Sequence, residues 1–404
     1  MKNILELTGV RFFAAFVVCA YHFSPGFGLD SISSTLRPAA MSAVSLFFIL
    51  SGFILSYTYV NKIQTIKLSQ FFWARFSRLS PAFIAVMIAM IPIRLVFLMA
   101  APESSRAAYG LSIDSPILGF TWLANLFLVA VFIPMLNPWL YFWNPPAWSL
   151  TAEAVFYVSF PFVIILLKKI KHELSFVWTS SIIYLILCLT ITGTFFVTMN
   201  MSVDVLPEWY KSSLSLGGVT QLTANEIRSY TFTYFAYLLP FFHCFEFWIG
   251  CSIGYFFLKL ADKNMLPQKN MRNLLLLLSI LLIYLGYQVS NLTMGAMGLG
   301  IYAVYTLGFT LFIFTLACGS TFASRLLSHK WVVTLGKSSY ALYISHYAGM
   351  AFYQYLANIG ISFPKFTYYL AVVICVALSL AIYYFVEVPG QRWLINFGKT
   401  SLNL

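Results

Sequence analysis

Long apolar runs, each close to 20 residues and almost free of charge, recur along this 404-residue chain. An α-helix of about 20 residues spans the roughly 30 Å hydrocarbon core of a bilayer, so each run predicts a transmembrane helix. The composition agrees, because 60% of the residues are hydrophobic and only 9% are charged, compared with about 25% charged in soluble proteins. Too little polar sequence remains to cover a fold in water. The sequence therefore excludes a soluble enzyme, a disordered tail and a disulfide-stabilised scaffold.

The predicted fold class is all-α: a polytopic membrane protein with about ten transmembrane helices. The runs place these helices at residues 8–29, 40–60, 82–101, 148–167, 176–199, 230–258, 273–291, 297–321, 331–357 and 366–386. Lys and Arg occur in short clusters between the runs, which is typical of membrane topology rather than of a nucleic-acid-binding surface. We expect a single domain over residues 1–404 and no nucleic-acid partner.

One further apolar stretch, at about residues 116–136, is flanked by Pro116, Pro134 and Pro138. If it crossed the membrane, the basic clusters before and after it would lie on opposite sides. We therefore expect a re-entrant or interfacial segment. With this choice most of the 24 basic residues lie on one side, and by the positive-inside rule that side and both termini are cytoplasmic. The expected location is the cytoplasmic, or inner, membrane.

Ionisable side chains within the runs are candidate functional residues, because each costs about 2.5–3.5 kcal/mol to insert. Arg11 and His22 lie eleven residues apart on the first span, which is three helical turns and roughly 16 Å of rise. They therefore share a helix face, with Arg11 at the cytoplasmic mouth and His22 deep in the bilayer, so a long substrate can contact both. The alternative is structural: Arg11 extends to lipid phosphate and His22 is a hydrogen-bonded core histidine.

Arg75 and Arg78 lie three residues apart at the cytoplasmic start of the third span, just before Pro81. Their guanidinium groups suit a polyphosphate, although juxtamembrane arginines often only set orientation. Ser149 and Glu153 lie one turn apart on the span after the re-entrant stretch. A carboxylate at this depth needs a partner, and a histidine on another helix is the candidate. A structural hydrogen bond between helices is the alternative.

The sixth and ninth spans also carry polar residues. On the sixth, His243 and Glu246 lie one turn apart, and we interpret them as a mutually satisfied structural pair; Gly250 and Gly254 predict close helix packing. On the ninth, a polar stripe ends at His346. The chain has no zinc-binding spacing, no phosphate-binding glycine loop and no Gly-x-Ser-x-Gly motif, so we expect no metal.

Taken together, these motifs resemble the acyltransferase family 3 membrane proteins, which O-acylate surface glycans in bacteria. The matching motifs are Arg11-x10-His22, Phe47-Phe48-Ile49-Leu50-Ser51-Gly52-Phe53, Arg75-x-x-Arg78-x-x-Pro81, Trp148-Ser149-Leu150-x-x-Glu153-x-x-Phe156-Tyr157, Ser339-Tyr340-x-x-Tyr343-x-Ser345-His346 and Glu387-x-Pro389. Two positions differ, because Ala74 and Val388 stand where the family often has a basic residue.

The resemblance implies a membrane O-acyltransferase that moves an acyl group, most often acetyl, from cytoplasmic acetyl-CoA to a hydroxyl of a cell-surface glycan or lipid-linked saccharide. Polysaccharide, lipopolysaccharide O-antigen and peptidoglycan are candidate acceptors. It also implies ten spans with cytoplasmic termini. Some relatives carry an additional SGNH hydrolase-like domain outside the membrane, and none is expected here. The expected partners are acyl-CoA, the glycan acceptor and membrane lipid, with assembly into a homo-oligomer left open.

The resemblance also suggests a role for each candidate residue. Arg75 and Arg78, helped by Arg11, would bind the anionic end of the donor. His22 would be the general base or the acyl-accepting nucleophile, and Glu153 would orient its imidazole. The residues expected to shape the cavity, one of whose hydroxyls would stabilise the oxyanion, are Ser51, Trp148, Ser149, Tyr340 and His346.

A multi-span transporter or flippase for a glycan or lipid is the alternative function, because buried ionisable residues also line permeation paths. The sequence has no visible inverted repeat, which disfavours this alternative. Release of free CoA from acetyl-CoA distinguishes the two functions, since a transporter liberates none.

Overall fold

The computed structural model describes residues 4–63, 65–100, 117–133, 142–170, 173–207, 223–292, 304–361 and 363–402. These ranges are helical almost throughout and contain no strand, which confirms the predicted all-α class. The α-helices are α1 (Leu5–Phe23), α2 (Asp30–Tyr59), α3 (Leu68–Ala100), α5 (Ile117–Leu126), α7 (Ala147–Lys168), α8 (Glu173–Asn200), α10 (Ala224–Thr233), α11 (Pro240–Asp262), α12 (Lys269–Leu292), α14 (Thr306–Ala317), α15 (Ser324–Leu327), α16 (Lys330–Lys337), α17 (Ser339–Asn358), α18 (Thr367–Ile382) and α19 (Val388–Ser401). The short helical turns are η1 (Pro25–Phe27), η2 (Ala130–Phe132), η4 (Val203–Val205), η5 (Tyr234–Leu238) and η7 (Tyr383–Glu387).

Eight helical segments of the described chain are long and apolar enough to cross a membrane, which confirms a polytopic membrane protein. They are Leu5–Phe27, Asp30–Tyr59, Leu68–Ala100, Ala147–Lys168, Trp178–Asn200, Pro240–Asp262, Lys269–Ser290 and Thr367–Ser401. The two other predicted spans, 297–321 and 331–357, also coincide with helices. In the first, the described part is the 12-residue α14, and residues 297–303 lie outside the described ranges. The second is divided between α16 and the more polar α17.

The stretch at 116–136 contains one short helix. Helix α5 has 10 residues and therefore a length of about 15 Å, half the thickness of the hydrocarbon core. The turn η2 follows it without extending it. This agrees with a segment that does not cross the bilayer. The flanking Pro116, Pro134 and Pro138 lie outside the described residues.

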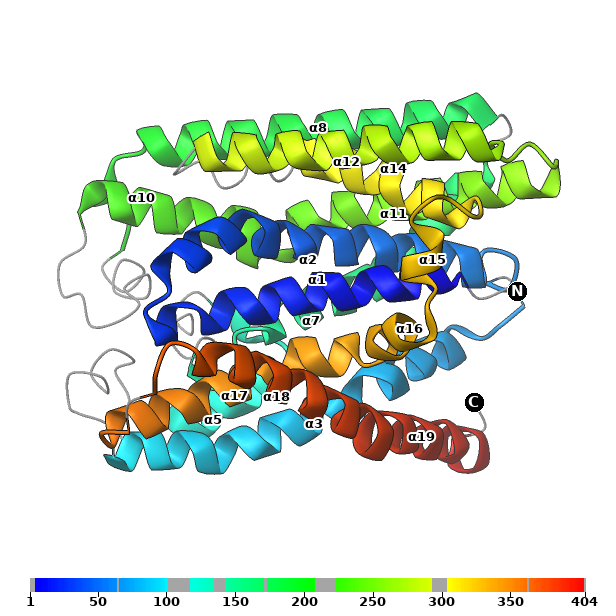
Figure 1. Cartoon of the computed structure of the whole chain (residues 1–404). Coiled ribbons are helices and arrows are strands. Elements are labelled where there is room, and N and C mark those ends of the chain that lie inside the picture. Colours follow the sequence, from blue (N-terminus) through cyan, green and yellow to red (C-terminus); the bar gives the residue numbers. More distant parts are fainter. Residues whose placement is uncertain are drawn as a thin grey trace.

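The long helices run side by side in one bundle, with α1 and α2 in its middle and α8 and α12 along one edge (Figure 1). The buried share of each helix agrees with its position: 72% of the most apolar 18-residue segment of α2 is buried, but only 17% of the corresponding segments of α8 and α12. Edge helices with apolar exposed faces are the ones that contact lipid. Helix α1 begins and α19 ends at the same end of the bundle, as the predicted topology requires (Figure 1).

Glycines bring α2 and α11 into close contact. A Cβ atom on Gly250 would collide with the backbone carbonyl of Ile49, and one on Gly52 with that of Phe247. Gly254 meets the backbone of Phe53 in the same way. Because lipid supplies no hydrophobic driving force between helices, such close backbone approach is a main source of their association. The predicted small-residue face of α11 is therefore confirmed.

Helix α1 is fixed near both of its ends. A Cβ on Gly9 would collide with the carbonyl of Leu327 in α15, and one on Gly336 of α16 with the carbonyl of Thr8. Towards the other end, the Tyr368 hydroxyl of α18 donates a hydrogen bond of 3.0 Å to the Ala20 carbonyl. These contacts lie within three residues of Arg11 and His22, so both candidate residues are on segments of α1 that are packed closely against neighbouring helices.

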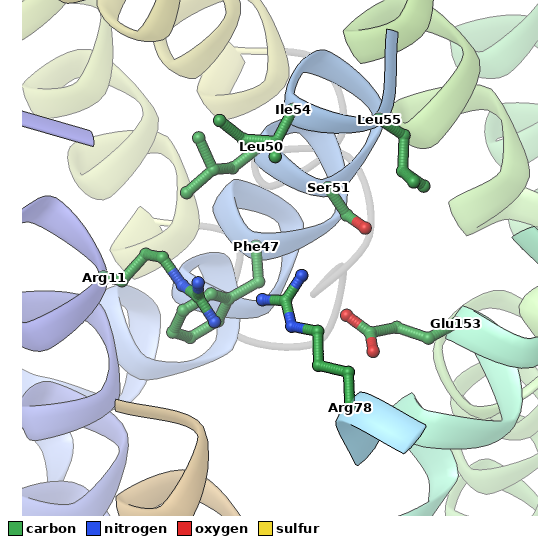
Figure 2. Close-up of a pocket in the computed structure, with 8 residues that line it drawn as sticks. All are labelled: Arg11, Phe47, Leu50, Ser51, Ile54, Leu55, Arg78 and Glu153. Carbon is green, nitrogen blue, oxygen red and sulfur yellow. The ribbon is translucent and has the colours of Figure 1, made fainter. Parts of the chain in front are cut away.

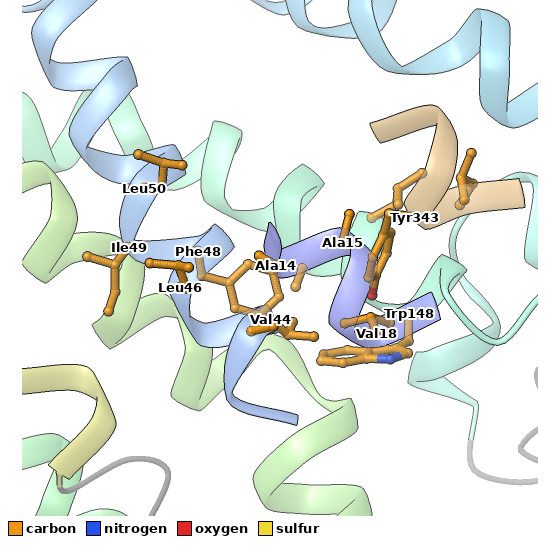
Figure 3. Packing of buried hydrophobic residues seen from close by; sticks show 14 of the residues in the cluster. Ala14, Ala15, Val18, Val44, Leu46, Phe48, Ile49, Leu50, Trp148 and Tyr343 are labelled. Atoms are coloured by element: carbon orange, nitrogen blue, oxygen red, sulfur yellow. The ribbon is translucent and has the colours of Figure 1, made fainter. Parts of the chain in front are cut away.

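The core beside α1 combines small and aromatic side chains. Figure 3 shows Ala14 of α1 beside the ring of Phe48 from α2, and Ala15 on the side of Tyr343, with Trp148 nearby. Phe48 is 1% exposed and meets Trp148 edge-on, with ring centroids 6.1 Å apart. The small residues of α1 leave room for these rings, which form the walls of the candidate site.

Candidate active site

His22 lies in the last turn of α1, next to the point where the helix stops. Pro25 has no backbone N–H to continue the helix, and Gly28 adopts a left-handed conformation with φ of 63°. The C-terminus of a helix carries a partial negative charge, which favours a cationic imidazolium over a neutral ring. The local sequence therefore places His22 at a helix end that favours a positive charge, which offsets part of the cost of burying that charge in the bundle.

His346 of α17 is the hydrogen-bond partner of His22. Nε2 of His346 lies 3.0 Å from Nδ1 of His22, and the two ring planes are inclined by only 25°, with centroids 5.0 Å apart, so the nitrogens face each other nearly in plane. Nδ1 of His346 contacts the Tyr343 carbonyl at 2.7 Å. His346 is fully buried, whereas His22 is half-buried. Two helices far apart in the sequence thus fix the orientation of His22.

Both histidines line a cavity of about 230 Å³. Trp148, Tyr237 and Arg37 also line it. The Trp148 ring packs against Tyr237, with ring centroids 4.7 Å apart. Aromatic walls with a few polar groups are typical of sites that bind an organic substrate such as a sugar.

Arg11 and Arg78 face a second, narrower cavity of about 50 Å³ together with Ser51 and Glu153. Figure 2 shows both guanidinium groups directed into the same space, with the carboxylate of Glu153 and the hydroxyl of Ser51 at its side. Neither guanidinium forms a hydrogen bond or an ion pair with any residue that the structure describes. Glu153 instead accepts a hydrogen bond of 3.2 Å from the Tyr157 hydroxyl. Two cations without a protein acceptor make this cavity suitable for an anion.

Arg75 does not line this cavity. Its Nη2 donates a hydrogen bond of 2.8 Å to the Tyr59 hydroxyl, and its guanidinium lies over the Tyr59 ring, 5.1 Å from the centroid. The two arginines that were predicted as a phosphate-binding pair therefore have different surroundings. Arg78 faces the cavity, and Arg75 lies one turn earlier on α3, held by an aromatic side chain of α2.

A third cavity of about 40 Å³ is lined by Ser149, Tyr340 and Ser339 among others. The Tyr340 hydroxyl donates to the Leu79 carbonyl at 2.8 Å, and Ser149 Oγ donates to the Pro146 carbonyl at 2.9 Å. Ser339 is fully buried, and its hydroxyl has no hydrogen-bond partner among the described residues. An unpaired buried hydroxyl costs free energy unless something in the cavity uses it.

The three cavities follow one another along α1. The Arg78 cavity and the Ser339 cavity share Arg11, Phe47 and Glu153 as lining residues. The Ser339 cavity and the His22 cavity share Val44 and Tyr343. Arg11 and His22 therefore both face the interior of the bundle, as their spacing predicts, and they lie at the two ends of one row of cavities.

The expected contact between Glu153 and His22 is not found in the described part of the chain. Glu153 lines the two cavities at the Arg11 end, whereas His22 lines the cavity at the other end. The histidine that sequence reasoning assigned to the cavity wall, His346, occupies the place expected for Glu153. Sequence reasoning sought a histidine partner for the Glu153 carboxylate. In the structure Glu153 accepts a hydrogen bond from Tyr157. His22 pairs with His346 instead.

His243 and Glu246 form the structural pair that their spacing predicts. Nδ1 of His243 lies 2.7 Å from Oε2 of Glu246, and both side chains are fully buried. Nε2 of His243 contacts the Tyr237 carbonyl at 2.9 Å, and Glu246 Oε1 accepts a bond of 3.3 Å from Thr306. The pair supports the cavity wall, because the His243 ring packs against Trp148 with centroids 5.4 Å apart.

Sequence reasoning missed three residues near the cavities. Arg37 and Tyr237 line the His22 cavity, but Arg37 lies before the predicted span 40–60 and Tyr237 is one of many tyrosines. Glu387, quoted above only within a terminal motif, is buried and close enough to Arg78 and Arg11 for a Coulombic interaction. The Glu387-x-Pro389 motif marked this residue in the sequence, but residue spacing alone does not predict that Glu387 lies close to Arg11 of α1 and Arg78 of α3.

Comparison with known proteins identifies similar chains. The family model for the acyltransferase domain matches residues 4–386. Acyltransferase MdmB of Streptomyces mycarofaciens is 29% identical over 172 residues, 41% of this chain and 40% of its own. Peptidoglycan O-acetyltransferase OatA of Listeria monocytogenes is 29% identical over 181 residues, 42% of this chain and 26% of its own. A Staphylococcus aureus protein is 23% identical over 97% of this chain and 58% of its own length. This chain thus spans less than two thirds of each of these three relatives, and no solved structure matches it.

Proposed function

Because this chain belongs to the acyltransferase domain family, whose model matches residues 4–386, we propose that it is a membrane O-acyltransferase with an acyl-CoA donor. The donor enters from the cytoplasmic side of the inner membrane, and the acyl group is most often acetyl. The acceptor is a hydroxyl of a cell-surface glycan or a lipid-linked saccharide. Peptidoglycan is the acceptor named for the Listeria relative, and it is one member of this class.

The row of cavities along α1 is the observation that carries this proposal. At one end Arg11 and Arg78 offer guanidinium groups that form no hydrogen bond or ion pair with the described residues. The carboxylates of Glu153 and Glu387 lie close enough to them for Coulombic interaction. At the other end His22 faces a cavity of about 230 Å³. The two residues on α1 are separated by roughly 16 Å of helix rise. A donor with an anionic head and a thin arm ending in a thioester has this shape.

The cavity sizes support a division of roles. The two cavities near Arg11 have volumes of about 50 and 40 Å³, and such space accepts a thin chain or a few water molecules but no sugar ring. The His22 cavity is several times larger and has aromatic walls, so it is the one suited to the acceptor. We propose Arg11 and Arg78, with Arg75 at the entrance, as the donor-binding residues.

The reaction needs one proton transfer in each direction. The acceptor hydroxyl attacks the thioester carbonyl, a C–O bond forms, and His22 removes the hydroxyl proton as general base. The C–S bond then breaks, and the thiolate of CoA receives the proton from His22. Ser339 offers a hydroxyl that is unpaired within the described chain along the path of the thioester, whereas the Tyr340 hydroxyl already donates to the Leu79 carbonyl. Glu153 acts at the donor end, where its charge and the hydrogen bond from Tyr157 hold the two arginines in place.

His22→Ala tests this proposal. The purified protein in detergent, given acetyl-CoA and an envelope glycan fraction, is expected to release free CoA and to add the mass of one acetyl group to the glycan. His22→Ala should lower this rate about 10²-fold to 10⁴-fold, the contribution of a general base. His329→Ala is the matched control, because His329 is exposed at the start of α16, away from the cavities. Near-normal transfer by a folded His22→Ala protein contradicts the assignment, and absence of CoA release by the wild type favours the transporter alternative.

A further inference from the structure

The hydrogen bonds around His22 form a chain of three groups: the Tyr343 carbonyl, the His346 ring and the His22 ring. The carbonyl contacts Nδ1 of His346 at 2.7 Å, and Nε2 of His346 contacts Nδ1 of His22 at 3.0 Å. A carbonyl oxygen can only accept a hydrogen bond, so Nδ1 of His346 must carry a proton. The direction of the whole chain follows from this end.

A neutral imidazole has one N–H and one lone pair. With Nδ1 of His346 protonated, its Nε2 is the lone-pair nitrogen and accepts from His22. Nδ1 of His22 is then the donor, and Nε2 of His22 keeps its lone pair. A doubly protonated His346 would reverse the second bond. However, His346 is fully buried and neither ring forms an ion pair with any described residue, so a charge on His346 would have no compensation.

We propose that His346 is a positioning residue that holds His22 in the tautomer with a proton on Nδ1 and a free lone pair on Nε2. This inference rests on the proposed function, since it assigns Nε2 as the atom that takes the acceptor's proton. Within the described residues no other side chain hydrogen-bonds the His22 ring, and His22 lines the cavity of about 230 Å³. The Val18 carbonyl, one turn earlier on α1, also accepts a hydrogen bond from the ring, so His346 acts together with the main chain of α1. The two ring planes are inclined by only 25°, so the N–H of one ring can point along the lone pair of the other.

The assignment gives a complete proton path. Nε2 of His22 accepts the hydroxyl proton as the C–O bond forms, and His22 becomes an imidazolium that still donates from Nδ1 to His346. Its charge is stabilised by the lone pair of His346 and by the C-terminus of α1. When the C–S bond breaks, the proton on Nε2 moves to the sulfur of CoA. His346 keeps its own proton on Nδ1 throughout.

The tautomer is measurable without any turnover. The full-length protein with ¹⁵N-labelled histidine contains five histidines, and the two nitrogen types differ in chemical shift. The spectrum lost in His22→Ala identifies the His22 signals. We expect a protonated Nδ1 and a bare Nε2 in the wild type, and a mixture of tautomers in His346→Leu. A His22 protonated at Nε2 in the wild type overturns the proposal, as does an unchanged His22 spectrum in His346→Leu.

Kinetics provide the second measurement. His346→Leu should lower kcat by about 10²-fold to 10⁴-fold, the range for a catalytic imidazole that loses its orienting group, with little change in the KM for the donor. His346→Gln places an amide oxygen near the former Nε2 position and should recover part of kcat. Equal activity of His346→Leu and wild type overturns the proposal. If the expected spectrum is found but no CoA is released, the proposed function fails while the tautomer assignment stands.

Discussion

Arg78 is the residue whose removal tests the donor site most directly. Its guanidinium faces the cavity that it shares with Arg11, and no described protein group competes for its hydrogen bonds. A hydrogen bond to a charged group contributes about 1.5–3 kcal/mol, so replacing one partner loses about that much binding free energy. Arg78→Met should therefore raise the Kd for CoA by about tenfold to 150-fold. Arg78→Lys keeps the positive charge but not the planar guanidinium, so its Kd for CoA should lie between those of the wild type and Arg78→Met.

The measurement is calorimetric titration of CoA into purified protein, because CoA carries the anionic end of the donor and cannot transfer an acyl group. Arg75→Met should have a smaller effect than Arg78→Met, since Arg75 already donates to Tyr59. Lys169→Met is the control for the loss of one positive charge: Lys169 is exposed at the end of α7, and its removal should change Kd by less than about twofold. If folded Arg78→Met binds CoA as tightly as the wild type does, the cavity is not the donor site.

Two further predictions concern stability and are measured by thermal unfolding in detergent. Gly250→Val should cost about 1–3 kcal/mol because its side chain collides with α2. Gly193→Ala has open space around it inside α8 and should be neutral or stabilising by up to about 1 kcal/mol. Equal melting temperatures for the two variants would contradict the packing of α2 on α11. Glu246→Leu should cost about 3–5 kcal/mol because it leaves His243 buried without its carboxylate, and an unchanged melting temperature would show that the pair is not coupled.

Relations within one helix could be predicted from the sequence, because helical periodicity is local. The shared face of Arg11 and His22 and the pairing of His243 with Glu246 follow from spacing alone, and the structure contains both. The small-residue face of α11 is a third example. The spacing of residues along one helix determines these features, and the packing of the neighbouring helices does not change them.

Relations between helices could not be predicted in the same way. Sequence reasoning required a partner for the Glu153 carboxylate and chose a histidine on another helix. In the structure Glu153 faces the cavity that the two arginines line, and His22 pairs with His346 of α17. The start of α2 was also predicted incorrectly, because the helix begins at Asp30, ten residues before the predicted span 40–60. Arg37 was therefore assigned to a loop, although it lies on α2 and lines the His22 cavity.

The fixation of α1 at both ends has a consequence for which substrates can react. The glycine contacts near Arg11 and the Tyr368 hydrogen bond near His22 hold the two residues at a set distance along α1. Under the proposed function, a donor bound at Arg11 brings its thioester to His22 only when the length of its arm matches this distance. Within this proposal, the spacing therefore selects the carrier of the acyl group by the length of its arm and does not distinguish one acyl group from another, because all acyl-CoA donors share the same arm.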